Sequence, residues 1–226
     1  LVKRSLEDVF IFASWNDWLV SKQQEKLDLQ FRNSGTVFSN VLVNRSADLM
    51  VAAYDKAQCL ALMENGYGFK DLKDYNYTSG EHTVAFVIGH KVVLDADGKS
   101  TILYGIALRG TQGIREWISN FTLGTGKNHS GFMFAAEDAW THIKNYMATF
   151  PDSQTRQACQ ENYKVWLTGH SRAAAVGNYL SATYFSNQVR RGDLYGYFFA
   201  VPNVAIGAQS ANASACIRNF NFSGDT

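Results

Sequence analysis

The stretch KVWLTGHSRAAAVGNYL, residues 164–180, decides how the rest of the chain is interpreted. Its first part, KVWLTG, has the composition of a short buried strand, and its last part has the composition of an alanine-rich helix. Gly169 and Ala173 flank the junction, and small residues are what a close approach of strand and helix requires. The stretch therefore predicts a strand, a tight turn at Ser171 and a helix.

Ser171 has two interpretations. It is a nucleophile held on a sharp turn, or it is an ordinary serine that caps the helix. The pattern G-x-S-x-G is a weak signal alone, and here Ala173 replaces its last glycine. The flanking strand and helix favour the nucleophile, because a helix N-terminus stabilises the negative charge of an oxyanion.

Hydrophobic patterning predicts the other elements. We expect, in chain order, a helix over 46–63 with Ser46 as its N-cap, a β-hairpin of 82–94 and 100–108 around the turn DADGK, an amphipathic helix over 131–150 ended by Pro151, a strand over 162–169, a helix over 172–189, and strands over 194–201 and 216–223. This alternation predicts an α/β fold with a mostly parallel central sheet and helices on both faces. We expect one domain over 1–226, in which residues 1–65 form an N-terminal helical region.

Composition excludes several classes of protein. The chain carries 21 basic and 20 acidic residues, a net charge of +1, so no surface for nucleic acid is indicated. No apolar run reaches the roughly 18 residues that a membrane helix needs. The first residues have no signal-peptide core and no initial Met, so we expect a processed or excised piece of a longer chain. Six glycosylation sequons leave the compartment open, with secretion slightly favoured over the cytoplasm.

The cysteines indicate neither a metal site nor a dense disulfide framework. Cys59, Cys159 and Cys216 are far apart, form no CxxC pair and have no histidine at zinc-ligand spacing. We expect buried free thiols, with one disulfide and one free thiol as the alternative. The segment Asp95 to Gly98 opens like a calcium loop but lacks the later ligands, so we interpret it as a turn and expect no cofactor.

Further motifs accompany the stretch around Ser171. They are RGT at 109–111, IREWI at 114–118, HSGF at 129–132, AVPN at 200–203 and NFNFSGD at 219–225. In this order and spacing the motifs resemble the class 3 lipases, the fungal-type triacylglycerol lipase family within the α/β-hydrolases. The resemblance extends over roughly residues 66–226, about two thirds of the chain.

The resemblance implies roles for four residues. Ser171 would be the nucleophile, and Asp225 would be the acid that orients a histidine base. The oxyanion hole would consist of the backbone N–H of Arg172 together with the backbone N–H and the hydroxyl of Thr111. These roles agree with the chemistry, since a serine hydroxyl needs a base and the oxyanion needs preorganised donors.

The resemblance also implies a lid. Ile114, Trp117, Ile118 and Phe121 recur at i, i+3, i+4 and i+7, which gives a helix one apolar face. Such a segment could cover an apolar cleft when closed and meet lipid when open. A fixed helix that packs on the core is the alternative.

The histidine base is not visible in this chain. The family pattern places it downstream of the acid, and we therefore expect it on a segment beyond Thr226. His170 is expected to pack beneath the turn, because successive side chains point apart. The other four histidines, His82, His90, His129 and His142, are expected to have no catalytic role.

Residues and resemblance together predict a serine carboxylic-ester hydrolase that acts on acylglycerols through an acyl-serine intermediate, with a lipid or ester as its partner. One alternative is a degenerate hydrolase fold that binds lipid or a protein partner. The missing histidine favours this alternative, as do Arg172, Ala173 and Ala174, which stand where the family often has leucine and glycine. Acyl transfer or peptide hydrolysis on the same machinery is a further alternative, since fold does not fix the substrate.

Overall fold

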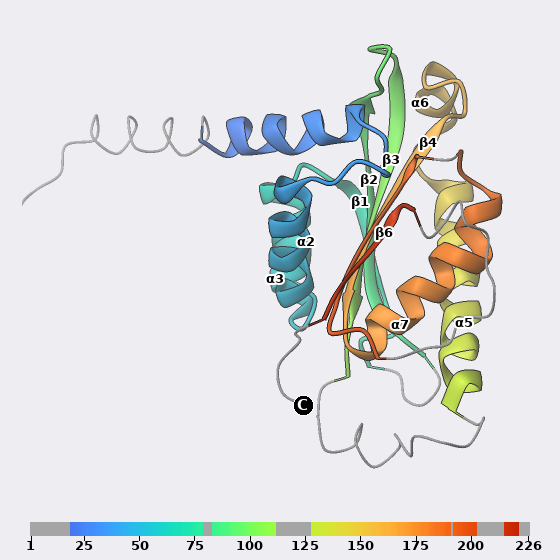
Figure 1. Ribbon diagram of the computed structural model, residues 1–226. Coiled ribbons are helices and arrows are strands. Elements are labelled where there is room, and N and C mark those ends of the chain that lie inside the picture. The colour runs from blue at the N-terminus through green and yellow to red at the C-terminus, as the bar shows by residue number, and fades with distance from the viewer. Residues whose placement is uncertain (1–18, 79–82, 112–127, 191, 203–214, 222–226) are drawn as a thin grey trace, which may run out of the picture.

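A six-stranded sheet forms the centre of the computed structural model, which describes residues 19–78, 83–111, 128–190, 192–202 and 215–221 (Figure 1). The strands are β1 (Lys70–Tyr75), β2 (Ala85–Leu94), β3 (Ser100–Arg109), β4 (Tyr163–His170), β5 (Leu194–Phe199) and β6 (Ile217–Phe220), and they lie in that order across the sheet. The two pairings among β1, β2 and β3 are antiparallel, and the pairings from β3 to β6 are parallel. The predicted α/β class with a mostly parallel sheet is confirmed.

Helices cover both faces of this sheet (Figure 1). On one face lie α2 (Asn40–Ala52) and α3 (Lys56–Ala61), and on the other lie α5 (Asn128–Thr149) and α7 (Arg172–Tyr179). The remaining helical segments are a helix over 19–28, η1 (Leu29–Arg32), η2 (Leu62–Gly66), α6 (Ser153–Ala158), η3 (Leu180–Tyr184) and η4 (Phe185–Asn187). The helices of each face enclose a separate apolar core.

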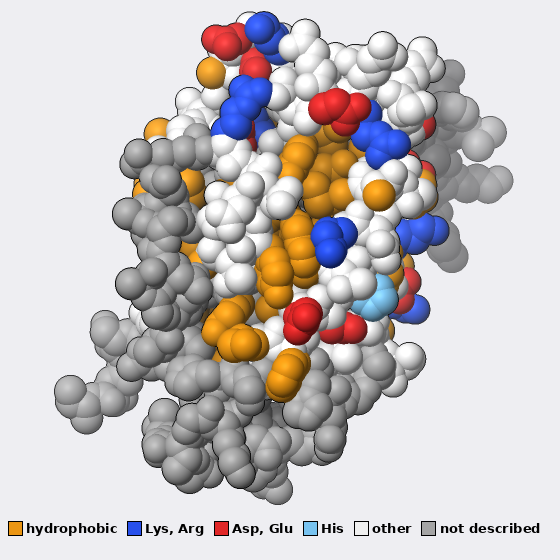
Figure 2. All heavy atoms as spheres, turned by 90° about the vertical axis from the view of Figure 1, so that its right-hand side faces the viewer, with side chains coloured by type: hydrophobic (Ala, Val, Ile, Leu, Met, Phe, Trp, Pro, Cys, Tyr) orange, Lys and Arg blue, Asp and Glu red, His pale blue; other side chains and the backbone are white. Residues whose placement is uncertain are grey.

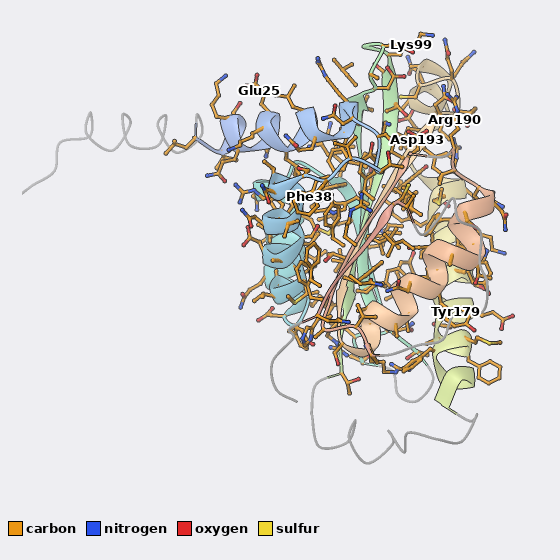
Figure 3. All side chains as sticks on the ribbon, viewed as in Figure 1. Glu25, Phe38, Lys99, Tyr179, Arg190 and Asp193 are labelled. Carbon is orange, nitrogen blue, oxygen red and sulfur yellow. The ribbon has the colours of Figure 1, made fainter. Side chains whose placement is uncertain are left out.

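Alternation along the strands explains the two cores, whose side chains fill both layers in Figure 3. Val165 and Leu167 of β4 pack with the α5 and α7 layer, whereas Trp166 between them packs with the α2 layer. Trp166 Nε1 donates to Ser46 Oγ at 2.8 Å, and Thr168 Oγ1 donates to the Ser46 carbonyl at 3.0 Å. These two bonds fix α2 to the central strand.

The predicted hairpin is confirmed. Strands β2 and β3 pair from Ala85 with Arg109 to Leu94 with Ser100. In the turn, Asp95 Oδ1 accepts hydrogen bonds from the backbone of residues 97 and 99, and Gly98 has a φ of 74°. This is the turn chemistry that the sequence indicates, with an Asp side chain folding back on the backbone and a glycine in the left-handed region.

The helix predicted over 46–63 is wrong in its boundaries. Ser39, not Ser46, caps α2, since its side chain accepts from the Leu42 N–H. The helix then breaks, because Asp55 is extended and its carboxylate caps α3 by accepting from the Gln58 N–H. Ser46 therefore lies inside α2, and Asp55 starts a second helix within the predicted range. The apolar residues of the two helices together resemble the periodicity of one longer helix.

Other boundaries differ less. The helix expected over 131–150 begins at Asn128, and the helix expected over 172–189 is α-helical only to Tyr179 before it continues as η3 and η4. Strand β1 was not predicted, because it is a charged and mostly exposed edge strand with an irregularity between Lys70 and Lys73. The short α6 was not predicted either.

The three cysteines are free and buried, as expected. Burial raises the pKa of the Cys59 thiol to about 12. This thiol therefore stays protonated at neutral pH.

A helical glycine provides a test of the packing between α7 and β5. A Cβ at Gly177 would lie 2.2 Å from Cε1 of Phe198, a ring with no exposed surface. We expect Gly177→Ala to lower the free energy of unfolding by about 1–3 kcal/mol, because a buried ring has no room to move. Chemical denaturation measures this change.

The matched control is Gly131→Ala in α5, where a Cβ would meet no described atom within 4 Å. That substitution should leave the free energy of unfolding unchanged or raise it by up to about 1 kcal/mol, because alanine favours helix. Equal effects of the two substitutions would contradict this account of the packing.

Candidate functional site

Ser171 lies between the end of β4 and the start of α7 with a φ of 56° and a ψ of −125°. A non-glycine residue in this region carries strain of about 1–3 kcal/mol. Its N–H donates to the Phe199 carbonyl at 2.9 Å, and its carbonyl accepts from the Ala174 N–H at 2.9 Å. The side chain makes no capping hydrogen bond within the described structure. Ser171 is thus a strained, half-buried residue and does not cap α7 through its hydroxyl.

Small residues allow the strand and the helix to meet at this turn. A Cβ at Gly169 would lie 3.1 Å from the carbonyl carbon and oxygen of Ala173. Ala173 and Ala174 are both fully buried, so their methyl groups belong to the core beneath α7. We call residues 169–173 the serine turn.

The neighbouring strand ends at the same edge of the sheet. Strand β3 runs parallel to β4, with Leu108 opposite Gly169. Beyond this register a Cβ at Gly110 would lie 2.8 Å from the His170 carbonyl oxygen, so the two backbones are in contact there. Thr111 follows directly after Gly110 and is therefore placed beside the serine turn.

The hydroxyl of Thr111 is buried without a partner among the residues that the structure describes. A buried hydroxyl without a partner costs about 1–3 kcal/mol. Such a group is satisfied when a ligand atom that accepts a hydrogen bond binds next to it.

The backbone N–H and the side chain of Arg172 have different surroundings. It is the first residue of α7, so its N–H has no acceptor within the helix. Its guanidinium reaches past the end of β3 and donates to the Thr83 carbonyl at 2.8 Å. Burial lowers the pKa of Arg172, although a guanidinium keeps its charge at any ordinary pH. The side chain therefore joins the serine turn to the segment that leads into β2.

His170 packs beneath the turn, as the sequence predicts. Its Nδ1 lies 2.8 Å from the hydroxyl of Tyr54, in the turn that follows α2. Burial lowers the pKa of His170, which favours the neutral imidazole. The sequence did not indicate Tyr54, because no spacing pattern relates two residues that are 116 positions apart.

Two of the histidines that are expected to have no catalytic role make structural contacts. His142 lies against Tyr75 with 4.6 Å between ring centroids and the rings tilted, and Nδ1 of the buried His90 lies 3.1 Å from the Tyr146 hydroxyl. Asp225, the lid residues Ile114, Trp117, Ile118 and Phe121, His82 and the side chain of His129 lie outside what the structure describes. Of the residues expected in the catalytic site, the structure describes Ser171, Arg172 and Thr111, which follow the adjacent ends of β4 and β3.

Two kinds of feature are absent from the part of the chain that the structure describes. Its helices include none with the length and apolar character needed to cross a membrane. Its side chains include no group of three or more His, Cys, Asp or Glu that could hold a metal ion.

An apolar band runs along the face that carries α5 and α7 (Figure 2). In this layer Trp140 stacks on Tyr184 at 5.1 Å between centroids, and Lys144 Nζ lies 5.9 Å from the Trp140 ring centroid. Near the start of α5, Met133 and Phe134 are 45% and 53% exposed. The first turns of α5 and α7 lie at the end of the molecule where β3 and β4 end (Figure 1).

Comparison with known proteins identifies one family. The model of the family "Lipase (class 3)" matches residues 105–215, which contain β4, the serine turn and α7. Among curated proteins there is no significant match.

The chain is similar to parts of several solved lipases. A deletion mutant of the Rhizomucor miehei lipase in its propeptide complex is 18% identical, with a TM-score of 0.48 over 80% of this chain and 56% of that one. The lipase of Rhizopus microsporus var. chinensis is 19% identical, with a TM-score of 0.44 over 74% and 59%. The Lip2 lipase of Yarrowia lipolytica is 14% identical, with a TM-score of 0.41 over 71% and 57%. The chain spans less than two thirds of the length of these lipases. Its mixed sheet, two helical layers and serine turn fit an α/β-hydrolase fold.

The strain at Ser171 predicts an unusual response to glycine. Both Ser171→Gly and Ser171→Ala remove the hydroxyl, but only glycine removes the Cβ that opposes a positive φ. We expect Ser171→Gly to exceed Ser171→Ala in free energy of unfolding by about 1 kcal/mol. Urea denaturation of both variants measures the difference.

Ser153 provides the matched control. It is the first residue of α6, and its φ is not positive. There the order should reverse, with Ser153→Gly less stable than Ser153→Ala by about 0.5–1 kcal/mol. If glycine were the less stable choice at both positions, the strain at Ser171 would have no energetic consequence.

Proposed function

We propose that the chain is a serine hydrolase that cleaves carboxylic esters, because the class 3 lipase family model matches residues 105–215. The observation that carries the proposal is the backbone of Ser171, held at a φ of 56° at the end of a central strand. Strain of this kind persists only where the surrounding structure imposes it, and it is concentrated at functional sites. The buried hydroxyl of Thr111, which has no partner among the described residues and follows the strand end beside the serine turn, supports the same proposal.

In the proposed reaction, Ser171 Oγ attacks the carbonyl carbon of the ester and its proton passes to a histidine base. The tetrahedral intermediate expels the alcohol, which takes the proton from the imidazolium, and an acyl-serine remains. Water then attacks the acyl group, and the carboxylic acid leaves as the Ser171 hydroxyl is restored. Asp225 would orient the histidine, which the family pattern places downstream of that residue.

The oxyanion would be held by donors from two neighbouring strand ends. They are the Arg172 N–H at the start of α7 and the N–H and hydroxyl of Thr111. The absence of an intrahelical acceptor for Arg172 and of a described partner for the Thr111 hydroxyl supports these roles. One such donor commonly lowers the barrier by about 3 kcal/mol.

We propose acylglycerols as the substrate class. The apolar face of Ile114, Trp117, Ile118 and Phe121 would cover the site as a lid and meet lipid when open. The exposed Met133 near the start of α5 and the apolar band on that face support contact with lipid (Figure 2). Apolar area of this kind on a protein surface is typical of interaction sites.

The proposed nucleophile can be tested by covalent labelling. We expect a fluorophosphonate to modify the full-length protein at Ser171, detected by peptide mass spectrometry, and Ser171→Ala to abolish both labelling and ester hydrolysis. The loss in kcat should reach at least about a thousandfold, because the proposed acyl intermediate forms on this hydroxyl.

Ser153→Ala serves as the control, because it removes an exposed hydroxyl from α6, and it should label like the unaltered protein. If the full-length protein gave no adduct under conditions that label another lipase, the alternative of a lipid-binding or partner-binding fold without turnover would be supported instead.

Thr111 can be tested separately from folding. We expect Thr111→Ala to lower kcat/KM about a hundredfold, because one oxyanion donor is lost. Its free energy of unfolding should not fall, since the hydroxyl has no described partner to lose. Ester hydrolysis and thermal unfolding measure the two effects.

The conservative variant Thr111→Ser keeps a hydroxyl and should retain kcat/KM within a few fold. Unchanged activity of Thr111→Ala, or equal losses in both variants, would remove the hydroxyl from the proposed oxyanion hole.

A further inference from the structure

A tyrosine hydroxyl lies beneath the two strand ends that carry the proposed catalytic groups. Tyr54 is half-buried in the turn after α2, and its hydroxyl lies 2.8 Å from Nδ1 of His170. The two rings meet edge-on, with 6.1 Å between their centroids. His170 directly precedes Ser171, so the hydroxyl is bonded to the last residue of β4 before the nucleophile.

The same hydroxyl contacts the end of β3. A Cβ at Gly110 would lie 2.2 Å from Tyr54 Oη and 3.1 Å from Cζ of that ring. No side chain fits into this space, so the Gly110 backbone rests directly against the phenol. Gly110 directly precedes Thr111. The hydroxyl therefore touches both strands one residue before each proposed catalytic group.

The turn that carries Tyr54 is held in place independently. The Tyr77 hydroxyl donates to the Ala53 carbonyl at 2.9 Å, and the guanidinium of Arg109 lies 4.7 Å from the centre of the Tyr77 ring. Arg109 precedes Gly110, so this route also connects the turn to the end of β3. Together with the bonds from β4 to Ser46, it gives Tyr54 a rigid base.

The protonation states suit a fixed hydrogen bond. Burial raises the pKa of Tyr54, with a smaller opposing effect of Arg109, and burial lowers the pKa of His170. Both groups are therefore neutral at ordinary pH, and the phenol can donate to an unprotonated Nδ1. Neither a phenolate nor an imidazolium is needed for the contact.

We propose that Tyr54 is a positioning residue of the ester-cleaving site. Its hydroxyl sets the distance between the end of β3, which leads to Thr111, and the end of β4, which leads to Ser171. Tyr54 itself would touch no substrate and would act through the His170 side chain and the Gly110 backbone that its hydroxyl contacts. The proposal rests on the proposed function. Its physical basis is that oxyanion donors act only when they lie within hydrogen-bond distance of the developing charge. A displacement of about 1 Å can reduce the rate about a hundredfold.

The test removes only the hydroxyl. In the full-length protein we expect Tyr54→Phe to lower kcat for a soluble ester about tenfold, while KM changes less than twofold. The rate at which a fluorophosphonate labels Ser171 should fall by the same factor. A tenfold loss corresponds to about 1.4 kcal/mol of transition-state stabilisation.

The control is Tyr163→Phe at the opposite end of β4, where the hydroxyl donates to the Gln188 carbonyl at 3.0 Å. It removes a similar hydrogen bond and should change the thermal unfolding midpoint comparably, with kcat and the labelling rate within twofold of the unaltered protein. A merely structural role of Tyr54 would give the same result for both variants.

A double-mutant cycle tests whether Tyr54 acts through Thr111. If the hydroxyl places the Thr111 donor, Tyr54→Phe should cost clearly less than tenfold once Thr111→Ala has removed that donor. Full additivity of the two losses, or an unchanged kcat in Tyr54→Phe, would overturn the positioning role and leave ester hydrolysis standing. A full-length protein that neither labels at Ser171 nor cleaves esters would overturn the proposed function, and the positioning role would fall with it.

Discussion

Parallel pairing of β3 with β4 is the constraint on which the rest of the structure depends. Because the two strands run in the same direction in a register that sets Leu108 opposite Gly169, they end together at one edge of the sheet. That ending brings the RGT segment and the serine turn side by side although they are about 60 residues apart in the chain. The α5 connection crosses one face to make this pairing, and the carboxyl edge of a parallel sheet is where such folds place their sites.

The features that the sequence predicted correctly are those with local causes. The hairpin follows from β-branched strands and a DADGK turn, and the serine turn follows from a strand, small residues and a helix within 17 positions. The break between α2 and α3 was missed because Asp55 is both compatible with a helix surface and able to cap a new helix. Strand β1 was missed because its exposed charged residues show no apolar alternation.

Most of the candidate site has local sequence signals, and one residue does not. Ser171, Arg172 and Thr111 stand in short motifs, so residue order and the family resemblance were enough to single them out as candidates. Tyr54 has no motif, and only the packing of α2 on β4 through Ser46, Trp166 and Thr168 brings it to the site. Contacts of this kind depend on the whole tertiary structure, which no periodicity encodes. The layer on the far side of the sheet is therefore part of the site's surroundings.

The lack of space for a side chain at Gly110 has a consequence for how sequences of this fold can diverge. A Cβ there would meet the Tyr54 hydroxyl and also the His170 carbonyl oxygen, so moving only one of these two groups would not make room for it. An alanine at position 110 demands a smaller residue at position 54 and also a shift of the last residue of β4, which would carry Ser171 with it. Positions 54 and 110 must therefore change together or not at all, and related chains should preserve or exchange them as a pair.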